Sequence, residues 1–340
     1  MNTNLPGTCF TVIEAGDIQI KTSQNFKNKY VYSSVYEYYQ LHSGWWKNTE
    51  LVLKQSSSIA TSTGFASLIS IYKNSPYFDK YLSLYLSCPA AFKSFEVWAL
   101  LQVIQETEFK FLETCSKPNI EISLTSALIQ ILDCKSELIQ AKYSKSLSIT
   151  GTELSVSKLE LQVQNREKRT GGDFALLFEW KDESGAIKIC PIVFQAKRVI
   201  SLDADISQHN KNVGYQFNIL SMSKCNPVYI FYNCDSTCNT ATPRLPTVKR
   251  VSDIKIKEEP INTNTIEQVL SFSMFILDIM SSDKYFVTNS RKSALNEILP
   301  GVDQLELSNI VTFSVDPSAL IQYKKEYKNY LEQKELINDH

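Results

Sequence analysis

Two apolar runs separated by a short polar turn constrain the fold of this chain more than any other feature. The runs are DFALLFEW at residues 173–180 and IKICPIVFQAKRV at residues 187–199, and KDESGA lies between them. Because Asp182–Gly185 are the only good turn residues between the runs, the pattern predicts two antiparallel strands joined by a hairpin. If the turn is centred on Ser184, Asp173 lies directly opposite Gln195.

This register brings three polar side chains to one face of a sheet. Directly opposed residues lie about 5 Å apart at Cβ, and side chains alternate along a strand. Lys197 therefore projects on the same face as Gln195, close to Asp173. A register shift of one residue would scatter these groups, so the prediction depends on the turn.

Hydrophobic periodicity predicts the remaining elements. Residues 10–115 are expected to be largely helical, and residues 234–262, which are polar and carry three prolines, are expected to form a long surface loop or linker. Apolar spacing predicts helices over 90–113, 121–133, 206–224, 264–281 and 318–336, a further element near 291–299, and strands over 156–164, 227–233 and 309–315.

The order helix, three strands, helix, strand predicts an α/β core, with a mixed sheet flanked by helices. The helix-breaking segment Cys115–Asn119 separates a helical N-terminal region, residues 1–115, from the rest of the chain. This region is expected to sense a trigger or bind a partner protein. Residues 116–240 are expected to form the core, and residues 241–340 a loop plus helical C-terminal region that packs on it. The aromatic residues from Tyr30 to Trp46 are expected to be core rather than a base-stacking surface.

The cluster of Asp173, Gln195 and Lys197 suits metal-assisted hydrolysis of a phosphodiester. Mg²⁺ prefers oxygen ligands, which the Asp173 carboxylate and the Gln195 amide oxygen can supply. A cation would offset the charge that develops on the phosphate, and Lys197 would hold the attacking water or stabilise that charge. The alternative is a cross-strand ion pair between Asp173 and Lys197 on an exposed sheet face, which would contribute only ~0–1 kcal/mol.

These residues resemble the motif of the PD-(D/E)xK, restriction-endonuclease-like superfamily. Gly172-Asp173 stands where the motif has Pro-Asp, and Gln195-Ala196-Lys197 stands where it has Asp/Glu-x-Lys. Glu121 matches the acidic residue that the family often carries on its first helix. Gln216 matches the polar residue on the helix after the last motif strand. The resemblance covers residues 115–235 and departs from the motif at Gln195, where a neutral amide replaces an acid.

The resemblance implies a metal-dependent endonuclease with a restriction-endonuclease-like core. It implies Asp173, Gln195 and Glu121 as ligands of Mg²⁺ or Mn²⁺, and Lys197 as the residue that assists the water. DNA is the expected substrate, and a role in bacterial antiphage defence is also implied. Two alternatives remain open: a catalytically decayed module that binds nucleic acid or a partner protein, and a toxin-like RNase on the same fold.

Local positive charge agrees with a nucleic-acid partner. The whole chain has a formal charge of −1, so any nucleic-acid surface must be a local patch. Arg166, Lys168 and Arg169 precede Asp173, and Arg198 follows Lys197, which indicates a groove for phosphates. Gln216 is expected to contact the same ligand. The alternative is an ordinary solvated loop.

The sequence also bears on location and on other metals. No secretory leader and no apolar stretch long enough to cross a bilayer is present, so we expect a soluble, cytoplasmic protein without a membrane partner; an oligomer stays open. Cys234-Asp-Ser-Thr-Cys238 has zinc-like spacing, but a structural zinc site needs four ligands. Only Cys225 lies nearby, so zinc is the weaker hypothesis.

Overall fold

We analysed a computed structural model of the chain. The structure describes residues 89, 92, 94–115, 119–159, 173–201, 203–210, 214–234, 245–255, 261–265, 267–304, 307 and 309–338. The expectations for Tyr30–Trp46, for Gly172 and for the basic residues Arg166, Lys168 and Arg169 concern residues outside these ranges.

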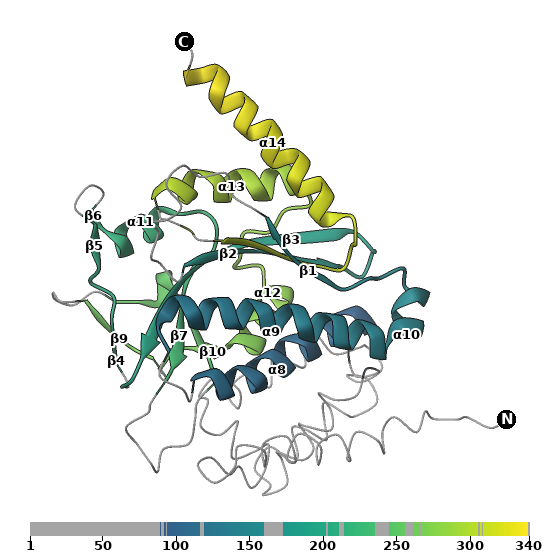
Figure 1. The fold of residues 1–340 in the computed structure, drawn as a ribbon, viewed down its shortest axis with the longest axis horizontal. Coiled ribbons are helices and arrows are strands. Elements are labelled where there is room, and N and C mark those ends of the chain that lie inside the picture. Colours follow the sequence, from purple (N-terminus) through teal and green to yellow (C-terminus); the bar gives the residue numbers. More distant parts are fainter. Residues whose placement is uncertain are drawn as a thin grey trace, which may run out of the picture.

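Seven of the described strands form one mixed sheet, in the order β1-β11-β2-β3-β7-β8-β10. Helices cover both faces of this sheet, so the described part of the chain is a three-layer α/β/α structure (Figure 1). The sheet strands are β1 (Ser155–Leu159), β2 (Phe174–Lys181), β3 (Ile187–Val199), β7 (Pro227–Asn233), β8 (Thr247–Arg250), β10 (Leu270–Ser271) and β11 (Asn309–Ser314). The other elements are α8 (Phe95–Cys115), α9 (Glu121–Lys142), α10 (Ser144–Ile149), β4 (Asp203–Asp205), β5 (His209–Asn210), β6 (Gly214–Tyr215), α11 (Gln216–Met222), η3 (Val251–Asp253), β9 (Asn262–Asn264), α12 (Phe272–Ser281), α13 (Arg291–Gln304) and α14 (Ala319–Asn338). An α/β fold with a mixed sheet flanked by helices is therefore confirmed.

The β2–β3 hairpin has the predicted register. Phe174 pairs with Phe194, and the pairing continues to Lys181 and Ile187, so the turn is centred on Ser184. The Asp182 side chain holds the turn, because its Oδ1 accepts from the Ser184 and Ala186 backbone amides at 2.9 and 3.0 Å. These bonds and the Ser184 hydroxyl lower the pKa of Asp182 to about 2. Gly185 has φ of +80°, a conformation that L side chains rarely adopt.

The alternation of the strands produces two apolar cores, one on each face of the sheet. Even-numbered residues of β2 and β3 pack against α8, α9 and α12, and odd-numbered ones pack against α11, α13 and α14. Helix α8 shares its core with the sheet, so the boundary expected at residue 115 falls between two helices, α8 and α9, that pack together.

The last strand lies inside the sheet, next to the edge strand β1. Strand β11 is parallel to β2 and separates it from β1, with which β11 is antiparallel. Strands β8 and β10 also come from the C-terminal region, which therefore builds part of the sheet rather than only packing on it. Local periodicity predicts strand β11 but carries no information on its distant neighbours.

Three expected element boundaries are wrong. The helix expected over 206–224 is only α11, and the chain before it forms short strands, in a stretch where Gly214 disfavours a helix. The loop expected over 234–262 contains β8, η3 and the start of β9. The helix expected from residue 264 begins at Phe272, because the Ser271 hydroxyl caps it by accepting from the Met274 amide.

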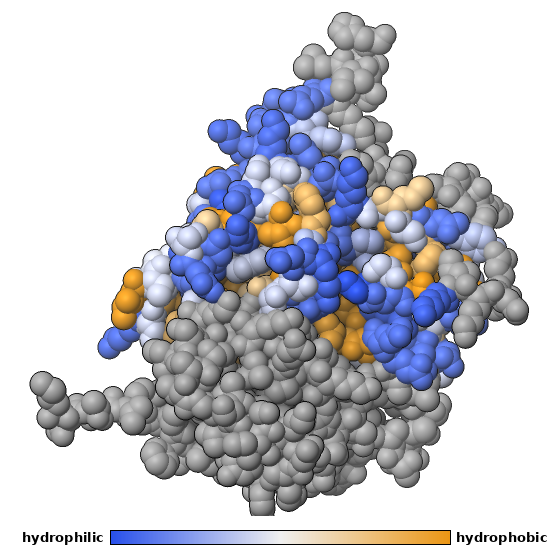
Figure 2. Space-filling view, turned by 180° about the vertical axis from the view of Figure 1, so that it is seen from behind, coloured by the Kyte–Doolittle hydropathy of each residue, from blue (hydrophilic) through white to orange (hydrophobic). Residues whose placement is uncertain are grey.

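Helix α14 extends away from the sheet. Its inner side, Ala319, Tyr323 and Tyr327, is buried at helical spacing. Hydrophilic residues gather over its outer side, as Figure 2 shows from behind the view of Figure 1. No helix within the described ranges combines the length and the apolar character that a membrane span requires.

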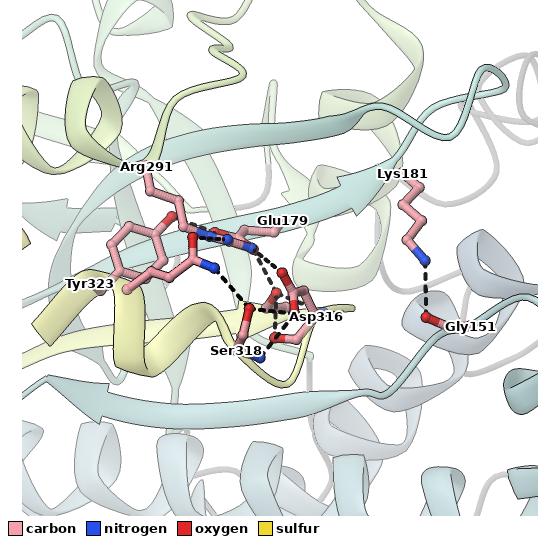
Figure 3. A network of polar contacts seen from close by, with 9 residues as sticks. Gly151, Glu179, Lys181, Arg291, Asp316, Ser318 and Tyr323 are labelled. Carbon is pink, nitrogen blue, oxygen red and sulfur yellow. Dashed lines mark hydrogen bonds and ion pairs between the residues drawn. The ribbon is translucent and has the colours of Figure 1, made fainter. Parts of the chain in front are cut away.

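A fully buried carboxylate on β2 ties four elements together (Figure 3). Glu179 accepts from Arg291 Nε and Nη2 of α13 at 2.9 and 2.8 Å, and from the hydroxyls of Ser314 and Tyr323 at 2.6 and 2.5 Å. Arg291 also binds Asp316 at 2.8 Å, and these carboxylates raise the pKa of its guanidinium despite burial. The bidentate contact satisfies a charge that has no access to water.

We expect Arg291→Met to destabilise the fold by about 3–5 kcal/mol, because it leaves the Glu179 carboxylate buried without its counter-charge. Urea denaturation followed by circular dichroism measures the loss. The control, Lys328→Met, removes the cation of an exposed pair with Glu332 and should cost at most about 1 kcal/mol. Adding Glu179→Gln to Arg291→Met should recover part of the stability, because the buried charge is then removed as well. Equal losses of stability in Arg291→Met and in the control Lys328→Met would contradict the structural role of the Glu179–Arg291 pair.

Candidate active site

The hairpin register brings Asp173 and Gln195 into direct contact. Asp173 immediately precedes β2, and Gln195 lies on β3 one residue beyond the Phe174–Phe194 pair. The Gln195 Nε2 donates to Asp173 Oδ1 at 2.5 Å, and the backbone amide of Ala196 donates to the same oxygen at 3.0 Å. Both side chains are buried, each with 3% of its surface exposed.

A third amide reaches the carboxylate from α11. Gln216 is the first residue of this helix, and its Nε2 donates to Asp173 Oδ2 at 3.2 Å. The backbone amide of Gln216 in turn donates to the carbonyl of Gln208 at 3.0 Å. The start of α11 is thereby tied both to Asp173 and to the chain segment after β4.

Burial controls the charge of Asp173. Removal from water raises the pKa of this carboxyl to about 7, and Glu121 acts in the same direction. Lys197 and the hydrogen bonds from Ala196 and Gln195 oppose the shift without cancelling it. Asp173 therefore changes its protonation state near neutral pH, as catalytic groups often do.

Lys197 lies on the face predicted for it. It follows Gln195 by two residues on β3, so both side chains leave the same side of the sheet. Its Nζ donates to Gln208 Oε1 at 2.7 Å, and its charge lowers the pKa of Asp173. Sequence reasoning missed Gln208, because this residue lies in a stretch that periodicity assigned to a helix.

Glu121 reaches the same end of the sheet from α9. It is the first residue of that helix, and its Oε2 accepts from the Arg198 backbone amide at 3.0 Å. Its charge raises the pKa of Asp173, so the two carboxylates sense each other electrostatically. The structure thus gathers Asp173, Gln195, Gln216, Lys197 and Glu121 around one end of β3.

Arg198 points away from this group. Alternation sends its side chain to the opposite face from Lys197, where it hydrogen-bonds Cys234 and lowers the pKa of that thiol, together with Cys115. Cys225 instead donates to the Glu297 carbonyl. Two of the three cysteines considered for zinc thus have other partners, and the third, Cys238, lies outside the described ranges.

The side chains of the site supply oxygen donors that fit a hard cation. They offer two carboxylates and two amides, and the Oε1 of Gln216 is buried with no hydrogen-bond partner. Gln195 now turns its Nε2 to Asp173, so its amide must rotate for the oxygen to face a cation. Within the described ranges no three His, Cys, Asp or Glu side chains form a metal-binding group.

Comparisons with known proteins add a family but no activity. Residues 148–290 match the model of DUF6615, a family of unknown function. The match covers less than half of the chain and contains Asp173, Gln195, Lys197 and Gln216, but not Glu121. The searches of curated proteins and of solved structures found no match.

We expect Asp173 to make stability pH-dependent. In the unfolded chain it ionises near pH 3.8, whereas the folded protein holds the proton up to about pH 7. Between these values the folded state binds more protons, so raising the pH lowers the free energy of unfolding, by up to about 4 kcal/mol for this residue.

Asp173→Asn removes this contribution and tests it. An asparagine keeps Oδ1 as an acceptor, and its Nδ2 would meet the unpartnered Oε1 of Gln216 once that amide turns. The stability of the variant relative to the unmodified protein should therefore rise between pH 4 and pH 7 in urea titrations. Asp203→Asn, at an exposed position, is the control. A difference that stays constant over this range would contradict the shifted pKa of Asp173.

Proposed function

We propose that this protein is a metal-dependent nuclease with a restriction-endonuclease-like core and that DNA is its substrate. One observation carries the proposal: the buried Asp173–Gln195 contact at 2.5 Å, with Lys197 on the same face of the hairpin. The order α9, β2, β3, α11, β7, with β3 parallel to β7, is compatible with that core. Strand β11 lies between β1 and β2, so these two consecutive strands are not neighbours in the sheet.

In this proposal Asp173, Gln195 and Glu121 hold Mg²⁺ or Mn²⁺, and the free Oε1 of Gln216 is available as a further donor. The cation would supply positive charge beside the scissile phosphate. Cation binding requires Asp173 to lose its proton, so it should strengthen as the pH rises through about 7.

Lys197 would orient the attacking water and stabilise the negative charge of the transition state. The Gln208 Oε1, 2.7 Å from the Lys197 ammonium, restricts where that ammonium can lie. This contact does not neutralise Lys197, because an amide carries no charge.

The neutral Gln195 favours a second candidate, a decayed site that binds nucleic acid or a partner protein without cutting it. A site with one carboxylate fewer holds a cation more weakly. A toxin-like RNase on the same fold is a third outcome. Neither the cytoplasmic location nor the defence role affects this choice, and both stay proposals.

We expect plasmid nicking that requires Mg²⁺ or Mn²⁺ and stops with EDTA. Lys197→Ala should slow cleavage by about 100-fold or more, since it removes a donor to the transition state. Lys188→Ala is the matched control, because Lys188 lies on the same strand and pairs with Asp182 at the turn. Single-stranded RNA and tRNA run in parallel separate the RNase outcome. Cleavage that survives both EDTA and Lys197→Ala would overturn the proposal, and DNA binding without cleavage would support the decayed module.

Gln195→Glu tests the metal directly. The added carboxylate should lower the Mg²⁺ concentration for half-maximal cleavage by about tenfold, because ligand charge controls the affinity for hard cations. Without metal the same variant should unfold at a lower temperature, since two carboxylates would then meet in a buried site. An unchanged Mg²⁺ requirement would exclude Gln195 as a ligand.

A further inference from the structure

A cavity lies at the end of α11 that is remote from the candidate active site. Its volume is about 470 Å³, within the range of small-molecule sites. It is enclosed by the end of α11 and the residues after it, the start of β7, the β8–η3 junction and the segment between α12 and α13. None of these residues belongs to the candidate active site.

Three cations line this cavity. Arg250 binds Asp253 through Nε and Nη2 at 2.7 and 2.6 Å, and Lys284 pairs with Asp278. Among the residues that the structure describes, no carboxylate pairs with Lys224, which is exposed. The cavity wall therefore carries one positive charge in excess, on a side chain that is available to an anion.

Aromatic rings and hydroxyl groups complete the wall. Phe286 exposes 37% of its surface although it is apolar, and Tyr285 is buried beside it. Ser221, Ser223 and Ser252 also line it; the Ser221 hydroxyl donates to the Phe217 carbonyl, and the Ser223 hydroxyl accepts from the Cys225 amide. An exposed ring is a stacking surface for a flat base, and hydroxyls near a lysine suit a sugar phosphate.

Asn226 fixes the backbone of Phe286, the residue that carries the exposed ring. Its Nδ2 donates to the carbonyls of Phe286 and Pro191, each at 2.9 Å, and its Oδ1 accepts from the Phe286 amide at 2.8 Å. Asn226 has φ of +45°, a backbone conformation that is uncommon outside glycine and is retained here by these bonds. The backbone that carries the ring is therefore held in place before any ligand arrives, which lowers the entropy cost of binding.

We propose that this cavity binds a nucleotide, with the base stacked on Phe286 and the phosphate on Lys224. The nucleotide could be free, or it could be one unit of a nucleic-acid chain. Ser221 at the cavity lies five positions after Gln216 at the candidate active site along α11, a rise of about 8 Å. If the nucleotide is one unit of a nucleic-acid chain, the inference rests on the proposed function. The cavity would then hold a nucleotide near the one that is cut.

Binding experiments distinguish these cases. Labelled AMP, ATP and a single-stranded DNA oligonucleotide are titrated by fluorescence anisotropy against the full chain carrying Asp173→Asn, so that cleavage cannot contribute. We expect Lys224→Ala and Phe286→Ala each to weaken binding by about tenfold, the loss typical of one charge-assisted hydrogen bond or one stacked base. Lys325→Ala, at an exposed position on α14, is the matched control, and thermal unfolding verifies that all variants fold.

Each outcome has one meaning. Binding of AMP or ATP that Lys224→Ala weakens assigns the cavity to a free nucleotide. Binding of the oligonucleotide alone, weakened in the same way, assigns it to a nucleic-acid chain. If neither Lys224→Ala nor Phe286→Ala differs from Lys325→Ala with any of the three probes, the proposal is wrong. Plasmid cleavage by the chain without Asp173→Asn is measured separately. Failure of the nuclease proposal is therefore distinguishable from failure of the nucleotide proposal.

Discussion

The register of the β2–β3 hairpin is the constraint on which the candidate active site depends. Strand side chains alternate with a period of two, so a slip of one residue would turn Gln195 and Lys197 to the face of α8 and α9. The turn prevents this slip. Asp182 accepts three hydrogen bonds from Ser184 and Ala186, and these bonds fix the position at which the chain reverses direction. A surface turn thereby determines chemistry at the far end of both strands.

Two buried carboxylates on the same face of β2 have different surroundings. Glu179 receives a bidentate guanidinium and two hydroxyls, which satisfy its charge within the fold. Asp173 accepts from the neutral amides of Gln195, Ala196 and Gln216, and burial raises its pKa to about 7. Glu179 is therefore structural, whereas Asp173 gains most from an added cation. The contrast in surroundings sets Asp173 apart from Glu179 without reference to any motif.

The sequence predicts what is local and misses what depends on distant partners. The hairpin, β7 and β11 follow from apolar runs and turn residues, and the contact between Asp173 and Gln195 follows from the register. The position of β11 between β1 and β2 could not be predicted, because its parallel pairing with β2 joins segments more than a hundred residues apart. Gln208 was missed for a related reason, since its role arises only from where the chain before α11 lies relative to Lys197.

The amide at position 195 has a physical rationale that does not require loss of activity. With a glutamate there, two carboxylates would lie at hydrogen-bond distance in a site with 3% exposure, and one would have to stay protonated. Gln195 instead donates to Asp173, so the fold tolerates the site without a cation. The Oε1 atoms of Gln195 and Gln216 can still turn toward a ligand. In the proposed function such a site gives up affinity for stability when empty, and a cation would bind only after Asp173 loses its proton and the Gln195 amide rotates.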